Sequence, residues 1–221
     1  MPHTILKLDN VSFNYPGGNT IIQDMNLEIN QNDLIIIKGE SGAGKSTFLQ
    51  LFNRFCDSSK GRILFHEKDL NKYKIDQIRR SLIYLPQLPV AIEGTIEKNL
   101  AFPFSFHSHK NKKFNPVKAR EWLDYFQLNL PLHHDGLKLS IGQKQRIALI
   151  RSILLEPEVL LLDEPGSALD SNNKRLIEQK IEHIIDSTNV TVLMATHSEV
   201  SFTGTHYRIL RLKDKNLMVE Q

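Results

Sequence analysis

The fold of this chain is decided by residues 39–46, which read Gly39-Glu40-Ser41-Gly42-Ala43-Gly44-Lys45-Ser46. The stretch fits the phosphate-loop pattern G-x-x-x-x-G-K-[ST]. The apolar run 34–37 before it is typical of a strand, and the apolar residues within 47–55 after it repeat on one stripe of a helix. Strand, glycine loop and helix N-terminus together make an anion cradle. Glycines let backbone N–H groups converge on phosphate oxygens, and the helix end adds partial positive charge.

The loop supplies most of the residues that we expect to hold a nucleotide. Lys45 is expected to reach the β and γ phosphates, and the Ser46 hydroxyl to ligate Mg²⁺. The alternative is an accidental glycine-rich turn, which is disfavoured because every fixed position and both flanks of the motif are present. The candidate nucleotide contacts in this part of the chain are Gly39, Ser41, Gly42, Ala43, Gly44, Lys45, Ser46 and Thr47.

Two adjacent carboxylates, Asp163 and Glu164, follow the apolar run 159–162. The run reads as a buried parallel strand, and ligands of open α/β sheets bind at the carboxyl edge of such strands. Successive side chains of a strand point in opposite directions, so one carboxylate can hold the shell of a Mg²⁺ ion while the next faces an attacking water. A solvated acidic turn is the alternative, and the phosphate loop upstream disfavours it.

A third segment, residues 139–146, reads Leu-Ser-Ile-Gly-Gln-Lys-Gln-Arg and resembles the LSGGQ signature of the ABC ATPases. Other segments resemble further motifs of that family: Walker B at 159–165, the D-loop at 167–170, the Q-loop glutamine Gln87, the H-loop histidine His197 and the adenine-stacking aromatic Tyr15. With the phosphate loop, seven motifs stand in the family's order between residues 15 and 197. The chain is therefore identified as a member of the ABC ATPases, and the resemblance covers nearly its whole length.

The resemblance implies a role for each site residue, with ATP as the nucleotide. Asp163 would bind Mg²⁺ together with Ser46 and Gln87, and Glu164 would be the catalytic base. His197 would orient the γ-phosphate by a hydrogen bond rather than take the proton. The other catalytic residues that the resemblance implies are Lys45, Gln87 and His197.

Two of these assignments have structural alternatives. A lone histidine after a strand, as His197 is, is usually structural or merely exposed. An aromatic residue near an N-terminal strand, as Tyr15 is, often packs in the core or at a sheet edge. The turn Pro16-Gly17-Gly18 directly follows Tyr15 and leaves it near a loop. That position suits a stacking platform, because an aromatic face accepts a base without sequence preference.

The signature segment implies a second subunit. In the family the helix that begins here meets the γ-phosphate bound by another copy, so Ser140, Gly142 and Gln143 would complete a partner's ATP site in a homodimer. Ser140 is also a good helix cap by type, and capping alone is the alternative. The chain departs from the family at Ile141, where glycine is usual. A β-branched residue is tolerable there only if the backbone is ordinary helix or extended.

We expect a single α/β domain over residues 1–221, with a phosphate-loop NTPase core in which helices flank a parallel sheet. An antiparallel β subdomain and a helical insert complete it. Residues 1–87 and 158–221 are expected to form the catalytic core with the β subdomain, and residues 88–157 the helical subdomain. The expected antiparallel strands are 5–15, 21–29 and 61–65, and the expected parallel strands are 34–37, 81–85, 159–162 and 190–195. Asn115-Pro116 begins a helix, and residues 208–219 read as a hairpin.

Composition narrows the cellular setting. The 221 residues carry a net charge of +3 and a single cysteine, Cys56, which suits a reducing cytosol. No apolar run approaches the roughly 20 residues that span a bilayer, and no secretory signal is visible. A basic cluster within 107–113 reads as a solvated connector, with proximity to an anionic membrane surface as the alternative. We expect a cytoplasmic location, peripheral on the inner face of the cell membrane, and no nucleic-acid partner.

The expected function is that of an ATP-binding and ATP-hydrolysing subunit of an ABC transporter, coupled to a separate membrane-spanning permease. Residues 93–103 read like those of the FetA group, bacterial ATPase subunits linked to iron export. A soluble regulatory ABC ATPase of a division or repair complex is the alternative. We expect the apolar segment 88–100 to form a groove for a short helix of the membrane subunit. Packing of these residues into the insert's own core is the competing interpretation. The apolar residues concerned are Leu88, Val90, Ile92 and Ile96.

Overall fold

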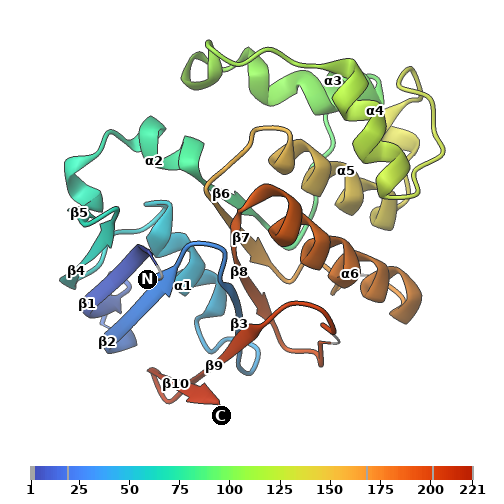
Figure 1. Ribbon diagram of the computed structural model, residues 1–221. Helices are drawn as coiled ribbons and strands as arrows, with labels where there is room; N and C mark the ends of the chain where they lie inside the picture. Colours follow the sequence, from blue (N-terminus) through green and yellow to red (C-terminus); the bar gives the residue numbers. More distant parts are fainter. Residues whose placement is uncertain (1–2, 19, 168, 201, 221) are drawn as a thin grey trace.

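The computed structural model describes residues 3–18, 20–167, 169–200 and 202–220, which fold around two sheets (Figure 1). The smaller sheet is antiparallel and has the order β2-β1-β4-β5. The larger has the order β10-β9-β3-β8-β7-β6. The first sheet contains β1 (Thr4–Asn14), β2 (Thr20–Asn30), β4 (Lys60–Phe65) and β5 (Lys68–Asp69). The second contains β3 (Leu34–Lys38), β6 (Leu82–Leu85), β7 (Val159–Asp163), β8 (Thr191–Thr196), β9 (Tyr207–Lys213) and β10 (Asn216–Glu220).

Five neighbouring strands of the larger sheet run parallel, and β10 pairs antiparallel at its edge. Every residue of β3, β7 and β8 is buried, which is the pattern of parallel strands covered on both faces. The helix α1 (Lys45–Phe52) packs against β7 and β8 on one side. The helix α6 (Ser171–Thr188) places its apolar stripe in the cluster on the other side.

The alternation of side chains along the central strands divides the interior into two clusters. In β3, Ile35 and Ile37 belong to the cluster that contains α1 and the antiparallel sheet. Leu34 and Ile36 belong to the cluster that contains α4 (Pro116–Tyr125), α5 (Ile141–Ile153) and α6. The expected α/β class, with its parallel core, antiparallel subdomain and helical part, is confirmed.

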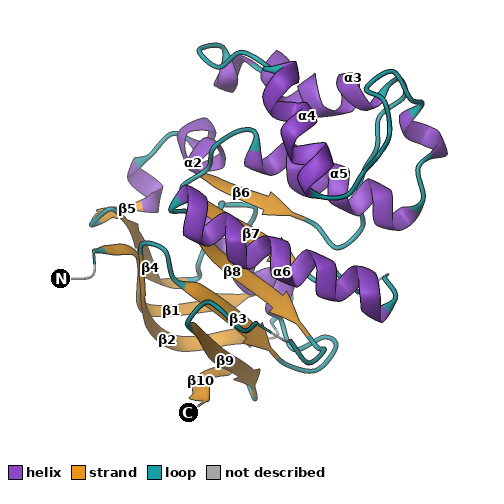
Figure 2. Cartoon of the chain, turned by 45° about the vertical axis from the view of Figure 1, so that its right-hand side comes forward, coloured by secondary structure: helices purple, strands orange, loops and turns teal. Residues whose placement is uncertain are grey.

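The helical part is built from α3 (Ile96–Ala101), α4 and α5, which Figures 1 and 2 show together beyond the β6 side of the larger sheet. The remaining elements are α2 (Ile75–Ser81) and the 3₁₀ turns η1 (Leu70–Lys72), η2 (Phe102–Ser105), η3 (His107–His109) and η4 (Gly136–Lys138). The helix α4 begins as the sequence predicts. Pro116 occupies the first turn, and the Asn115 side chain accepts hydrogen bonds from the backbone of Val117 and Lys118.

A buried amide fixes the start of the insert. Asn99 is fully buried, and its Oδ1 accepts from the Ile92 backbone N–H at 2.8 Å. Its Nδ2 donates to the carbonyl oxygens of Ile92 and Thr95 at 2.9 and 3.0 Å. One side chain thereby forms the hydrogen bonds that these loop N–H and carbonyl groups would otherwise lack. The loop that follows Gln87 is thus held against α3.

Several local predictions were wrong, and Tyr15 and Val190 lie just outside β1 and β8 rather than within them. The helix after the phosphate loop ends at Phe52, because Arg54 takes a left-handed backbone (φ 55°), so Phe55 and Cys56 lie beyond it. Burial raises the pKa of the Cys56 thiol to about 11, which keeps it neutral. Ser81 ends α2 instead of beginning β6. His109, expected in a solvated connector, is buried, and that burial lowers the pKa of its imidazole.

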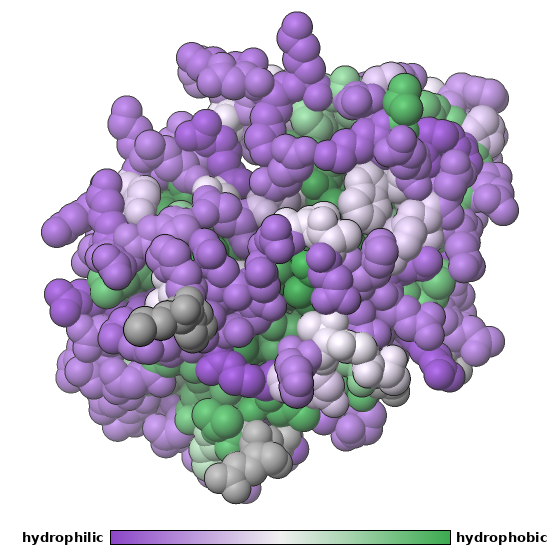
Figure 3. Space-filling model, in the orientation of Figure 1, coloured by the Kyte–Doolittle hydropathy of each residue, from purple (hydrophilic) through white to green (hydrophobic). Residues whose placement is uncertain are grey.

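The C-terminal hairpin is confirmed as β9 and β10, and β9 extends the parallel sheet beside β3. On the face shown in Figure 3, hydrophobic side chains gather at the lower end of the molecule, over this hairpin. Within the described ranges, no helix combines the length and apolarity needed to cross a membrane.

Candidate functional site

The phosphate loop joins β3 to α1 and depends on glycine at two positions. Gly42 and Gly44 have φ of 80° and 100°, a region that side-chain-bearing residues rarely adopt. A Cβ on Gly44 would also lie 2.4 Å from Cγ2 of Ile21. Gly44 is the N-cap residue of α1 and has no side chain with which to cap it. The first backbone N–H groups of α1 therefore face an anion site without a competing cap.

Lys45, the first residue of α1, lies across this loop. Its side chain is buried, and Nζ donates to the carbonyl oxygens of Gly39 and Glu40 at 2.9 and 3.0 Å. The same Nζ lies 3.5 Å from Oε1 of Glu164. A buried ammonium needs such partners, because desolvation without them is costly. The loop's own carbonyls thus hold the lysine at the point where a phosphate would arrive.

The Glu164 carboxylate is the centre of the site. Its Oε2 accepts from Nε2 of Gln87 at 3.3 Å and lies 3.0 Å from Nδ1 of His197. Glu164 follows β7 with a left-handed backbone (φ 47°), and its N–H donates to the carbonyl of Ala195 in β8. The segments after β6, β7 and β8 therefore meet on one side chain, together with Lys45 from α1. All four residues assigned to catalysis by the sequence lie together.

Asp163, the neighbour of Glu164, is buried at the end of β7. Its Oδ2 accepts a hydrogen bond of 2.7 Å from the hydroxyl of Tyr84, which in turn accepts from Gln50 Nε2 at 3.4 Å. Burial, followed by the bond to Asp163, raises the pKa of Tyr84, so its hydroxyl stays a proton donor. Sequence reasoning missed Tyr84. The signal available was its position three residues before Gln87 on a strand that ends at the same sheet edge.

Tyr15 stands beside the loop, fixed by its hydroxyl. That hydroxyl lies 2.8 Å from Oγ1 of Thr47 in α1, and the ring meets Phe13 edge to face at 4.9 Å between centroids. The residue is 48% exposed. It is therefore held at the mouth of the site with much of its surface open, as a base-stacking residue requires.

The loop residues, Tyr15, Gln87, Glu164 and His197 line a cleft of about 620 Å³, and Asp163 is not among its lining residues. Its lining residues are Tyr15, Ile21, Ser41, Gly42, Gly44, Lys45, Ser46, Thr47, Gln87, Glu164 and His197. Gly39 and Ala43 instead line an adjoining hollow of about 600 Å³, shared with the turn between β9 and β10. The described residues hold no cluster of three or more histidine, cysteine, aspartate or glutamate side chains suited to a metal ion.

The signature residues do not line this cleft. Ser140 caps α5, accepting from the Gln143 N–H at 3.2 Å, while its own N–H donates to Oε1 of Gln143 at 2.9 Å. Ile141 begins α5 with an ordinary helical backbone and is 57% exposed, so the departure from glycine causes no strain. A Cβ on Gly142 would lie 3.0 Å from Leu169. Ala168 of the D-loop falls outside the described residues.

A protein-family model described as "ABC transporter" matches residues 22–167 of the chain. The chain belongs to this family. It is an ATP-binding subunit of the ABC transporter type, with the ATP-hydrolysing domain that defines the family. The family assignment made from the sequence motifs is confirmed.

Relatives of this ABC ATPase include transport proteins of different lengths. The chain is 33% identical over 196 residues to the probable iron export ATP-binding protein FetA of Escherichia coli K12, covering 88% of this chain and 85% of FetA. It is 32% identical over 223 residues to the lactococcin-G-processing and transport ATP-binding protein LagD of Lactococcus lactis. That match covers 98% of this chain but 30% of LagD. The chain thus spans less than a third of the longer relative.

Solved structures share the fold of this ABC ATPase. CbiO1 of Clostridium perfringens, part of the CbiONQ ABC transporter complex, superposes with a TM-score of 0.83 at 24% identity. That match covers 98% of this chain and 87% of CbiO1. A bacterial Atm1-family ABC exporter with ATP bound also gives a TM-score of 0.83, at 27% identity. That match covers 97% of this chain and 38% of the exporter.

Gly44→Ala is expected to weaken ATP binding by at least tenfold. The added methyl meets Ile21, and alanine is strained at this φ, so the loop must move. Calorimetric titration of the wild-type and altered chains with ATP measures the change. Gly204→Ala is the matched control, because a Cβ there meets nothing closer than 4.0 Å. Unchanged ATP affinity in Gly44→Ala would show that the loop does not hold the phosphates.

Proposed function

We propose that this ABC ATPase uses ATP hydrolysis in its cleft to drive export through a separate membrane-spanning permease, from a peripheral position on the cytoplasmic face of the membrane. The observation that carries the proposal is the convergence of Lys45, Gln87 and His197 on the Glu164 carboxylate. Iron is the proposed cargo. The support is the match to FetA, which extends over most of both chains.

Glu164 is the proposed general base. Its carboxylate would accept a proton from the attacking water once a bound γ-phosphate draws Lys45 away from Oε1. Gln87 and His197 would then orient the carboxylate and the phosphate, because each already bonds to Oε2. Tyr15, at 48% exposure, would stack on the adenine ring.

Mg²⁺ is the proposed metal cofactor. The proposed donors are the Ser46 hydroxyl and the Gln87 amide oxygen, which line the cleft, and the buried Asp163 carboxylate, an all-oxygen set of the kind that Mg²⁺ prefers. Tyr84 fits this assignment, because its hydroxyl fixes one carboxylate oxygen of Asp163 in the way that outer-shell partners orient metal ligands. When bound, the ion would neutralise charge on the phosphates.

Glu164→Gln is expected to lower the steady-state hydrolysis rate by 10²–10⁴-fold, the usual contribution of a positioned general base. The amide keeps the shape of the side chain but cannot take a proton, so ATP binding is expected to persist. Phosphate release at saturating ATP and Mg²⁺ measures the rate, and calorimetry measures the binding. Glu67→Gln, at an exposed turn, is the control. Wild-type turnover in Glu164→Gln would rule out this base.

The second half of the site is proposed to come from another copy of the chain. Ser140 is exposed, and the signature segment does not line its own chain's cleft. These positions suit a homodimer in which each signature segment contacts ATP held by the partner. In this arrangement the two copies would hold two nucleotides between them.

Glu164→Gln is expected to form a dimer with ATP and Mg²⁺ and to remain a monomer without nucleotide, because unhydrolysed ATP keeps the two copies together. Light scattering coupled to size exclusion measures the mass. Adding Ser140→Arg should abolish the dimer, and the chain should stay folded, because loss of the exposed α5 cap typically costs only about 1 kcal/mol. A monomer with ATP at every concentration, together with turnover strictly linear in protein, would contradict the shared site.

The permease is proposed to dock beside the segment that follows Gln87. Leu88 and Val90 are 73% and 63% exposed, which leaves two apolar side chains open next to the catalytic glutamine. The Val90 carbonyl accepts from Arg151 of α5 at 3.2 Å, so this surface is connected to the signature helix. Ile96 is fully buried, so for that residue packing in the insert's own core is the correct interpretation.

Val90→Asp is expected to leave ATPase activity and melting temperature nearly unchanged while abolishing recovery of the membrane subunit. An exposed side chain typically contributes less than about 0.5 kcal/mol to stability. Pull-down from detergent-solubilised membranes, with the multi-span proteins identified by mass spectrometry, makes the comparison. Val117→Asp is the matched control, at 66% exposure on α4. Unfolding of Val90→Asp would show that this exposed position supports the fold, and normal recovery of the membrane subunit would remove the docking site.

A further inference from the structure

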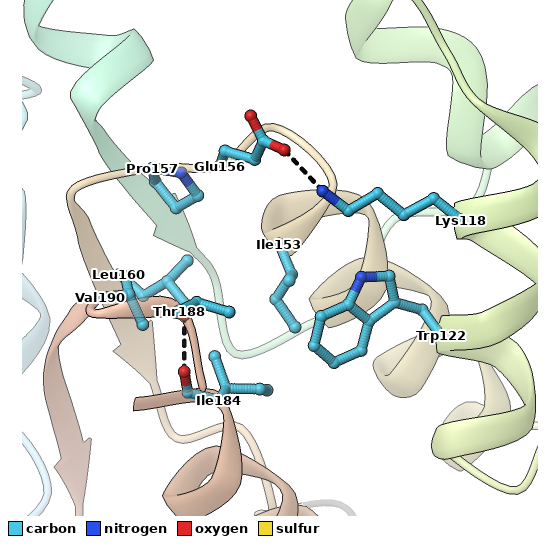
Figure 4. A pocket seen from close by; sticks show the side chains of 9 residues that line it. All are labelled: Lys118, Trp122, Ile153, Glu156, Pro157, Leu160, Ile184, Thr188 and Val190. Atoms are coloured by element: carbon cyan, nitrogen blue, oxygen red, sulfur yellow. Dashed lines mark hydrogen bonds and ion pairs between the residues drawn. The ribbon is translucent and has the colours of Figure 1, made fainter. Parts of the chain in front are cut away.

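A second pocket, of about 320 Å³, lies where the parallel strands of the larger sheet begin, at the end opposite to the cleft (Figure 4). Leu160 and Val190, which line it, stand at the amino ends of β7 and β8, whereas Glu164 and His197 follow their carboxyl ends. Trp122 comes from α4, and α5 and α6 supply further walls. We call it the seam pocket, because it lies where α4 meets β7 and α6.

The wall of the seam pocket is apolar. Figure 4 shows the Trp122 ring beside Ile153, with Leu160, Ile184 and Val190 on the far side of the hollow. Ligand sites in proteins are typically of about 300–1,000 Å³, mostly apolar, with a few polar groups that fix orientation. The seam pocket falls at the small end of this range.

Two lysines flank one carboxylate at the mouth of the pocket: Lys118, which lines the pocket, and Lys112, which stands beside it. Lys118 Nζ lies 2.6 Å from Glu156 Oε1, and Lys112 Nζ lies 3.9 Å from Glu156 Oε2. Two ammonium groups therefore share one carboxylate. Lys118, Lys112 and Glu156 keep side-chain exposures of 41%, 38% and 62%, so the charged groups remain accessible from outside. Lys112 Nζ also donates to the carbonyl oxygen of Leu155, so it stays beside Glu156 when an entering anion takes Lys118.

We propose that the seam pocket binds a small monocarboxylate with an aromatic or branched apolar body. The body packs against Trp122 and Ile153, and the carboxylate accepts a charge-assisted hydrogen bond from Lys118 in place of Glu156. A neutral ligand of the same shape forgoes this bond. An ammonium ligand meets the positive excess of Lys118 and Lys112.

A ligand bound here contacts two parts of the chain at once, and this role goes beyond the proposed transport function. Trp122 and Lys118 belong to α4, whereas Leu160 and Ile184 belong to β7 and α6. Beside the pocket, Tyr125 of α4 already packs on α6, 5.1 Å from the ring of His183 and 3.9 Å from Nζ of Lys180. A ligand that touches both helices favours one placement of α4 on the core over others. The seam pocket is thus placed to regulate the ATPase.

The chain's single tryptophan is Trp122, so intrinsic fluorescence reports this pocket directly. The full chain without nucleotide is titrated with 3-phenylpropionate, 3-phenylpropan-1-ol and 3-phenylpropylamine, and calorimetry gives the dissociation constants independently. We expect saturable binding of the carboxylate, with the alcohol and the amine at least tenfold weaker. Neither readout depends on ATP hydrolysis, so a failure here leaves the proposed function unaffected.

Two variants test the assignment of the residues. Lys118→Met should remove the tenfold preference for the carboxylate, and Thr188→Phe, at the exposed rim, should weaken all three probes. Lys113→Met, an exposed lysine outside the pocket, should change neither. No saturable binding by either method, equal affinities for the three probes, tighter binding of the amine, or an unchanged preference in Lys118→Met would each overturn the proposal. If Thr188→Phe does not fold, Lys118→Met decides alone.

Discussion

The contact between the Glu164 carboxylate and the Lys45 ammonium is the interaction on which the site depends. It joins the helix after β3 to the end of β7. The Oε2 atom of the same carboxylate contacts Gln87, which follows β6, and His197, which follows β8. Neighbouring parallel strands end at the same edge of their sheet, which brings these four segments together. The strand order β3-β8-β7-β6 therefore supports the proposed chemistry as well as the packing. In the proposed mechanism, a γ-phosphate that binds Lys45 would leave the Glu164 carboxylate with Gln87 and His197 as its partners.

Much of this arrangement follows from local sequence. The apolar runs before Gly39 and Asp163 predicted two buried strands, and Asn115 and Ser140 predicted the two helix starts that the structure shows. These features are local, because a strand's burial or a helix cap is set within a few residues. The family resemblance then supplied roles that no local pattern contains.

What the sequence did not reveal is contact between distant residues. Tyr84 donates to Asp163, 79 residues along the chain. Asn99 holds a loop because it is buried and bonded to Ile92, and the residue type alone does not distinguish it from an exposed asparagine. The early end of α1 depends on the left-handed backbone of Arg54, and the presence of an arginine does not predict that conformation. The burial of His109 likewise arises from tertiary packing. Propensity is a weak guide wherever such packing decides.

The division of the interior by the central sheet has an evolutionary consequence. The nucleotide loop rests on one cluster, and the surfaces formed by α4, α5 and α6 rest on the other. Because substitutions that are distant and share no partners usually act independently, changes in the helical cluster that do not touch the central strands leave the cluster under the loop in place. Selection can then change the helical surfaces of this ATPase while the cluster under the phosphate loop stays constant. The strand backbones, which both clusters share, are the part of the molecule with least freedom to diverge.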